Sequence, residues 1–468
     1  MQIILAIINL IIAVSMFFLK REQKMMLFWF SIMCLTAFPN IPFIGAILNI
    51  PTCFLLSEYT TIKKSWRALK RPWLSLIFSF IVIGVIAFYI FSPHYHELGL
   101  MGVISVVEFE IISKYLVLIL ALTCASGEIT FRNLLKVTYI GMLLLTFFGL
   151  LNLISGRPLF LEMIFAGSDN NSVSYDKVLQ DTADASDRMR VHSMFVYAFD
   201  YGYICLVSIL FAFYGIANKY INRTKGWTIV VCGIIGVVIC ACRTIYVCTL
   251  VAMFIYMMVA IPLRNRILIL ASFVIVSAFA FFLIPKVQEM AYLMFSAFDM
   301  DSDVEGSSLA SRIIQYQAVY YHVQDHIIFG NGYKFFEIDM GYAERDSGRV
   351  VDEELLGLEG IGMQMLLERG LFGLFVYLFF YFVLMLKIYI LHKVDKRTAA
   401  CSISILVAYL LFANFTGELH SVPPTLFITG ILLHKILCNI QSINTKKHAI
   451  KSFKGGKSQI SLVSSHSR

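Results

Sequence analysis

Long apolar stretches separated by short polar runs dominate this chain. A bilayer core about 30 Å thick is crossed by a helix of about 20 apolar residues, and about thirteen stretches approach that length. They are residues 1–19, 25–40, 41–59, 73–92, 101–124, 135–154, 193–217, 226–242, 244–262, 267–285, 361–391, 399–417 and 423–440. The pair around Pro39 and Pro42 also fits one broken helix, which would make the number twelve. The pattern predicts an all-α polytopic membrane protein.

Two long polar segments, 155–192 and 286–360, interrupt the apolar stretches. In the second one, apolar and aromatic side chains recur at helical spacing between Ser311 and His326, which predicts an amphipathic helix along the membrane surface. The interruptions divide the chain into N-terminal helices 1–154, the first loop 155–192, central helices 193–285, the second loop 286–360, C-terminal helices 361–440 and a basic tail 441–468.

Basic residues predict the orientation of these helices. Lys and Arg gather in short runs at 20–24, 63–71, 219–225, 264–266, 393–397 and 446–457. With thirteen helices, all of these runs fall on one face, which the positive-inside rule assigns to the cytoplasm. The two long loops would then lie outside, together with the N-terminus, and the tail would lie inside.

Composition supports this class and excludes others. The chain is 59% hydrophobic and 15% charged, far more apolar than soluble domains. Its net charge of +8 follows from the orientation runs, so no nucleic-acid partner is predicted. All 10 cysteines lie in apolar stretches, which argues against a disulfide framework or a thiolate metal site. The first stretch, 1–19, lacks a basic start and a cleavage site, and we interpret it as a retained helix.

Some arginines break the orientation rule, and they are the first candidates for function. Arg243 sits at the outer turn of a predicted helical hairpin, where it either snorkels to headgroup phosphates or binds an anion in a cavity. Arg188, Arg190 and His192 precede the helix predicted from residue 193, and Arg312 begins the amphipathic helix. Guanidinium groups match phosphate oxygens bidentately, so arginines from three segments could grip a lipid-linked pyrophosphate.

An ordinary ion pair remains the simpler reading of Arg188, because Asp184 and Asp187 lie beside it. Asp200 is interpreted either as a partner of Arg190 or as a satisfied polar residue of its helix.

Glu108, Glu110 and Lys114 are charges inside a predicted helix. Mutual pairing of Glu110 with Lys114 is the simplest reading, and a proton or substrate path is the alternative. Residues 329–332 read as a turn rather than a nucleotide-binding loop, because no strand precedes them. Three scattered histidines form no ligand set (His192, His322 and His326), so neither a metal nor a cofactor is predicted.

Four stretches together resemble the O-antigen polymerase and O-antigen ligase superfamily of bacterial membrane glycosyltransferases. They are Arg188-Met-Arg190-Val-His192-Ser-Met-Phe leading into Asp200-Tyr-Gly202; Cys240-Ala-Cys242-Arg243-Thr; Ser308 to Arg312, followed by residues 327–332 and Phe335; and Leu366-Leu-Glu368-Arg-Gly370-Leu-Phe-Gly373. The similarity covers about residues 185–375 in order.

The resemblance implies a metal-independent glycosyltransferase of GT-C-like architecture in the bacterial inner membrane, with its active site facing the periplasm. Arg190, Arg243 and Arg312 would hold the undecaprenyl pyrophosphate of a lipid-linked glycan, and Tyr316 would join the substrate-binding residues. An acceptor hydroxyl would attack the anomeric carbon with inversion. Membrane lipids and a chain-length regulator protein are the further partners implied.

Ligases of this superfamily carry a His-Asn pair where this chain reads Leu358-Glu359-Gly360, which favours a polymerase over a ligase. Glu359 becomes a candidate general base, with Glu354 and Glu353 as alternates, although Glu359 also fits a simple role at the start of the next helix. A ligase, or a flippase for the same lipid-linked sugar, remains the alternative function.

Overall fold

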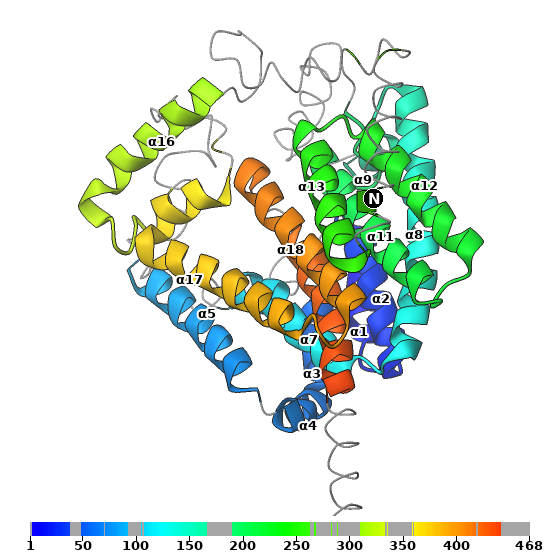
Figure 1. Ribbon diagram of the computed structural model, residues 1–468. Coiled ribbons are helices and arrows are strands. Elements are labelled where there is room, and N and C mark those ends of the chain that lie inside the picture. Colours follow the sequence, from blue (N-terminus) through cyan, green and yellow to red (C-terminus); the bar gives the residue numbers. More distant parts are fainter. Residues whose placement is uncertain are drawn as a thin grey trace, which may run out of the picture.

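The fold is known from a computed structural model, which describes a chain built from helices (Figure 1). The described residues are 2–37, 48–69, 71–91, 104, 107–165, 190–262, 266–267, 282, 288, 309–332, 335, 358, 360–417 and 420–440. Over these ranges the structure contains helices and no strand.

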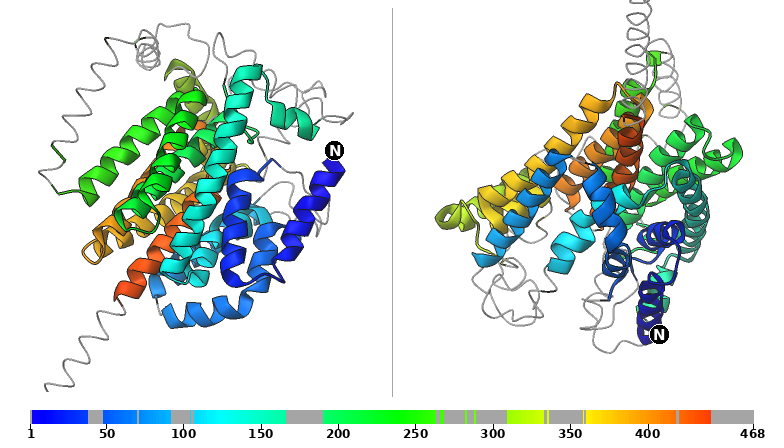
Figure 2. Two further views of the ribbon diagram at one scale, coloured as in Figure 1. Left: turned by 90° about the vertical axis from the view of Figure 1, so that its right-hand side faces the viewer. Right: turned by 90° about the horizontal axis from the view of Figure 1, so that it is seen from below.

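The N-terminal half forms short helices followed by one long one. In order these are α1 (Gln2–Ser15), α2 (Arg21–Cys34), α3 (Ile50–Ser57), α4 (Tyr59–Leu69), α5 (Pro72–Ile90), the π-helix η1 (Glu108–Tyr115) with α7 (Leu116–Cys124), α8 (Glu128–Ser155) and α9 (Leu159–Phe165). In both views of Figure 2, α1 lies at the edge of the bundle.

The C-terminal half holds most of the long helices. They are α11 (Ala198–Ala217), α12 (Arg223–Ile239), α13 (Arg243–Ala260), α16 (Leu309–Val323) with the short helix η2 (Gln324–His326), α17 (Ile361–Leu391), α18 (Lys396–Thr416) and a last helix, Val422–Ile440.

Six of the described helices are long and apolar enough to cross a membrane, which confirms the predicted all-α polytopic membrane class. They are α8, α11, α13, α17, α18 and Val422–Ile440. Two shorter apolar helices lie within α1 and α5. The predicted number of twelve or thirteen spans remains a prediction, since most of the stretch 267–285 lies outside the described residues.

Several helix boundaries differ from the predicted ones. The stretch 41–59 is described only from residue 48, and there Asn49 caps the eight-residue helix α3 by accepting a hydrogen bond from Thr52 N. α8 begins at Glu128 rather than at residue 135, because polar residues continue the helix beyond its apolar part. α11 begins at Ala198 rather than at residue 193, because the preceding residues form hydrogen-bonded turns.

Burial separates the central helix from the helices at the rim. α11 lies at the centre, with 83% of its most apolar window buried, and packs against α8, α12, α13 and α18. The corresponding windows of α13 and α17 are only 22% and 33% buried, although they are more apolar than that of α11. Apolar faces left uncovered on long helices are what contact with lipid tails requires.

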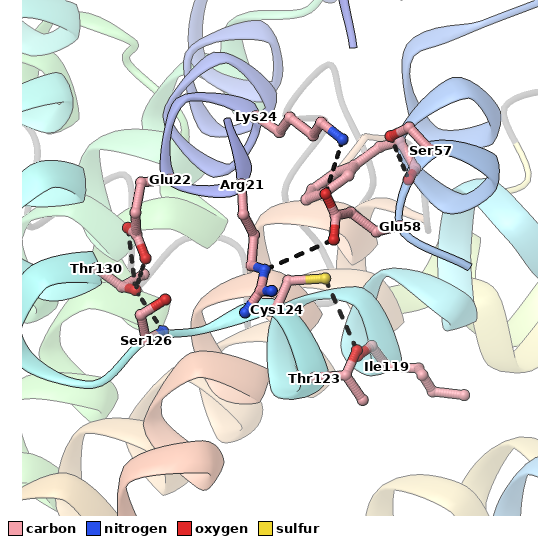
Figure 3. A network of polar contacts seen from close by, with 11 residues as sticks. Arg21, Glu22, Lys24, Ser57, Glu58, Ile119, Thr123, Cys124, Ser126 and Thr130 are labelled. Atoms are coloured by element: carbon pink, nitrogen blue, oxygen red, sulfur yellow. Dashed lines mark hydrogen bonds and ion pairs between the residues drawn. The ribbon is translucent and has the colours of Figure 1, made fainter. Parts of the chain in front are cut away.

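One end of the bundle collects basic residues. Glu58 binds Lys24 at 2.7 Å and Arg21 at 3.6 Å, and Thr130 at the start of α8 donates to Glu22 (Figure 3). The ring of Phe131 stacks on Tyr220, its centroid 5.2 Å away.

The same end contains two further basic runs, 219–225 and 393–397. Lys435 lies over the ring of Tyr220 and within 3.6 Å of Asp395, and Arg397 donates to Ala217 O at 2.8 Å. The predicted basic runs 20–24, 219–225 and 393–397 therefore share one end of the fold, as the orientation argument expects.

Candidate functional site

The opposite end of the bundle contains the described candidate residues. The segment from Arg190 to Tyr197 folds over this end before α11 begins. Ser193, with φ of 54°, donates through Oγ to Leu145 O at 2.6 Å, and its carbonyl accepts from Asn152 Nδ2 at 3.2 Å. His192 is buried, with Nδ1 2.8 Å from Val196 O, whereas Arg190 is exposed. Hydrogen bonds within the turn and to α8 thus fix the segment that follows Arg190.

Arg243 lies in the tight connection between α12 and α13. Cys242 is the N-cap of α13, Ala241 has φ of 52°, and Arg243 is the first residue of the helix and half-buried. α13 packs mainly on α18 and makes few contacts with α12. The two helices therefore diverge after their connection and do not pack against each other as the predicted hairpin.

One backbone contact ties the two arginine-bearing segments together. Val191 N donates to Ile239 O at 3.3 Å, so the residue after Arg190 meets a residue four positions before Arg243. Gly202 in the first turns of α11 leaves room for Cys240 and Ile245, because a Cβ there would lie 2.7 Å from Cys240 Sγ. The start of α11 therefore packs directly against the connection that carries Arg243.

Asp200, in the first turn of α11, pairs with a histidine from the end of the chain. His420 Nδ1 lies 3.0 Å from Asp200 Oδ2, and Asp200 is only 2% exposed. The partner of Asp200 is thus His420 and not Arg190.

Burial by itself lowers the pKa of His420, but the hydrogen bond to Asp200 and the charge of Asp200 outweigh it and leave that pKa raised. The charge of Lys114 on η1 acts in the opposite direction and lowers that pKa.

η1 carries a second cluster of charges. Lys114 Nζ lies 3.2 Å from Glu110 Oε1, which confirms the predicted pairing of these two residues. Arg369 of α17 adds a stronger partner, with Nη2 2.7 Å from Glu110 Oε2. One buried carboxylate therefore links two cations from elements far apart in the chain.

A kink in α17 follows Arg369 directly. Gly370 has φ of 62° and ψ of −165°, outside the helical region, so the helix breaks there. The turn 327–332 fills the break: Asn331 N and Gly332 N donate to Leu367 O and Glu368 O, while Leu371 N and Phe372 N donate to Ile327 O and Ile328 O. The predicted turn at 329–332 is confirmed, and its backbone satisfies the groups that the kink would leave unpaired.

α16 reaches this end by packing on the first part of α17. The helix predicted between Ser311 and His326 is confirmed as α16 with η2, and its position along the membrane surface stays a prediction. Val319 is fully buried against α17, whereas Tyr316 is 55% exposed. A Cβ on Gly360, at the start of α17, would lie 2.6 Å from Asn414 O near the end of α18. Figure 1 accordingly shows α16 and the upper ends of α13 and α18 on the same side of the molecule.

Four predicted site residues cannot be placed with the others. Arg188, Glu354 and Glu359 lie outside the described residues, as does the alternate Glu353, and Arg312 is described only as part of α16 without its side chain. Within the described ranges, no group of three or more His, Cys, Asp or Glu side chains could hold a metal ion.

Two charged residues of this end were not predicted as site residues. Arg369 belongs to the stretch Leu366–Gly373 that carries the resemblance, but its partner Glu110 is 259 positions away. His420 follows α18 in a short polar connection, and nothing in the local pattern links it to Asp200, 220 positions earlier.

The fold and the charged end define a multi-pass α-helical membrane protein with buried ionic groups near one face. Residues 228–378 match the family model described as O-antigen ligase, which confirms the resemblance to the O-antigen ligase and polymerase superfamily over that part of the chain. The match supports a function of the ligase or polymerase type. A search of curated proteins found no match.

Proposed function

We propose that this protein is a polymerase that joins undecaprenyl-pyrophosphate-linked repeat units into O-antigen or another surface polysaccharide. The reaction takes place at the outer face of a bacterial inner membrane, without metal and with inversion at the anomeric carbon. The observation that carries the proposal is the contact between Val191 N and Ile239 O, which brings the segments of Arg190 and Arg243 to the same end of the bundle.

Arginines at that place suit the chemistry of a pyrophosphate leaving group. As the glycosidic bond breaks, negative charge grows on the phosphate oxygens, and fixed guanidinium groups stabilise it. Each charged hydrogen bond contributes about 1.5–3 kcal/mol, and a bidentate fork makes two. Arg312, at the start of α16, would add a third guanidinium, with Arg188, His192, Tyr316 and Glu354 as further binding residues.

The choice of polymerase over ligase depends on Leu358-Glu359-Gly360, where ligases of the superfamily carry His-Asn. The family match, described as O-antigen ligase, is the observation that favours the second candidate, transfer of finished glycan to the lipid A core. Deleting the gene separates the two candidates: loss of a polymerase leaves single repeats on the cell surface, whereas loss of a ligase leaves no attached glycan.

Complementation of the deletion strain tests the site. Arg190→Ala and Arg243→Ala should each remove the glycan ladder while the protein remains in the membrane fraction, since losing one fork costs at least about a hundredfold in rate. Arg243→Lys keeps the charge but not the fork, and should give an intermediate ladder.

Arg132→Ala is the matched control, because Arg132 is an exposed arginine near the start of α8, at the basic end. Wild-type ladders from both alanine variants at Arg190 and Arg243 would contradict the site assignment.

A further inference from the structure

The pair of Asp200 and His420 has a geometry that the proposed function does not yet use. His420 donates or shares its Nδ1 proton with Asp200 Oδ2, 3.0 Å away, and its side chain is 47% exposed. No described residue hydrogen-bonds to Nε2 of this ring. The imidazole is therefore positioned through Nδ1, while Nε2 is available to accept a proton.

The carboxylate of Asp200 is buried, unlike that of an ordinary surface ion pair. Asp200 is 2% exposed, and its second oxygen, Oδ1, is buried with no hydrogen-bond partner among the described residues. Leaving a buried carboxylate oxygen unpaired costs free energy, so such a group points to a role beyond packing. The residues around it anchor the start of α11: Tyr203 Oη lies 2.6 Å from Thr425 Oγ1.

The pair lies at the same end of the bundle as the arginine-bearing connection. α13, which begins at Arg243, packs mainly on α18, and His420 follows the end of α18. A group that accepts a proton there would lie at the same end of the bundle as a pyrophosphate held by Arg243.

We propose that His420 is the general base of the glycosyl transfer and that Asp200 is its positioning residue. This inference depends on the proposed function and replaces Glu359 as the proton acceptor. Nε2 of neutral His420 takes the proton of the acceptor hydroxyl as that oxygen forms its bond to the anomeric carbon. The bond from the anomeric carbon to the phosphate oxygen breaks, and undecaprenyl pyrophosphate leaves with the electron pair. Asp200 holds the tautomer with the proton on Nδ1 and stabilises the imidazolium that forms.

Two charged groups that face His420 shift its pKa in opposite directions. Asp200 on α11 raises its pKa and Lys114 on η1 lowers it, with the net effect a rise above the usual value. Glu418, two positions away, lies outside the described residues. Because only the neutral ring accepts a proton, the rate should rise with pH through the pKa of His420.

The experiment uses purified full-length protein in nanodiscs, with radiolabelled undecaprenyl-pyrophosphate-linked repeat units as substrate. His420→Asn keeps a donor for Asp200 but provides no base, and it should lower the rate of elongation by about 10²–10⁴-fold. Native mass spectrometry should show that this variant binds undecaprenyl pyrophosphate as the wild type does. His434→Asn is the control, since His434 Nδ1 lies 2.8 Å from Leu122 O, near the basic end, and the change should leave the rate unaltered.

The pH profile tests the positioning role. Asp200→Asn should lower the rate and move the midpoint of the rising limb to lower pH, because the charge that raises the pKa of His420 is gone. A merely structural role for Asp200 would leave that midpoint unchanged.

Three results would overturn this inference: a wild-type rate in His420→Asn, an unmoved midpoint in Asp200→Asn, or a wild-type rate that falls with rising pH. The last would mean that the imidazolium is needed as a phosphate ligand. A wild-type protein that elongates no substrate would instead contradict the proposed function itself, so the two failures are distinguishable.

Discussion

The guanidinium of Arg369 and the carboxylate of Glu110 form a buried ion pair, with Nη2 and Oε2 2.7 Å apart. The pair joins η1 to α17 immediately before the kink at Gly370. Gly373 makes room for it, since a Cβ there would lie 2.2 Å from Arg369 Cβ. The side chain of Arg369 is 12% exposed and that of Glu110 is 6% exposed, so neither charge is well solvated if its partner is lost.

Glu110→Gln should destabilise the protein more than Arg369→Met. The first change leaves both Arg369 and Lys114 without a counter-charge, while the second leaves Glu110 paired with Lys114. Breaking a buried pair by removing one partner costs about 3–5 kcal/mol. The thermal midpoint of each variant is measured by fluorescence-detected size-exclusion chromatography, as the temperature at which half of the monodisperse peak is lost. The double variant should lose less stability than the two single variants lose together. Strict additivity of the two losses would argue against the ion pair.

Gly370→Ala should be much more harmful than Gly156→Ala. Both glycines have positive φ, 62° and 67°. Gly156 has the left-handed helical conformation, which costs alanine about 1–2 kcal/mol. Gly370, with ψ of −165°, lies in a region that is essentially restricted to glycine. A Cβ on Gly370 would also lie 2.5 Å from Gly330 N and from Ile328 O, whereas a Cβ on Gly156 meets nothing within 4 Å. The same thermal assay should therefore show a large shift for Gly370→Ala alone. Equal shifts would mean that the turn 327–332 does not fill the kink.

Cysteine labelling should confirm that the two ends of the bundle lie on opposite sides of the membrane. Arg157 follows α8 and Arg223 begins α12; both are exposed. In a Cys438→Ala background, which removes the exposed one of the native cysteines, Arg157→Cys should react in whole cells with a membrane-impermeant maleimide. Arg223→Cys should react only after permeabilisation. The reverse pattern would place the arginine end in the cytosol and contradict the proposed function.

Elongation of lipid-linked repeats should continue in excess EDTA. The proposed chemistry neutralises the leaving pyrophosphate with guanidinium groups, which need no divalent ion. The measurement compares the rate of the purified protein with and without chelator. A strong loss of rate that Mg²⁺ or Mn²⁺ restores would count against the arginine mechanism.

The sequence alone predicted the features that depend on residues close together in the chain. Membrane insertion depends on the summed hydropathy of about 20 consecutive residues, so stretches such as 361–391 and 399–417 were predicted nearly at their observed bounds. Helical periodicity located α16, and the positive-inside rule grouped basic runs that the structure does gather at one end. The spacing of Glu110 and Lys114 was enough to predict their pairing.

Only the tertiary structure decided which distant charges meet. Arg369 pairs with Glu110 across 259 positions and His420 with Asp200 across 220, and neither partner could be read from nearby residues. The kink at Gly370 depends in the same way on backbone groups supplied by residues 327–332. Hydropathy decides that a helix enters the membrane but not which neighbour it packs against. That choice is made by side-chain packing and by the cost of leaving a buried polar group unpaired.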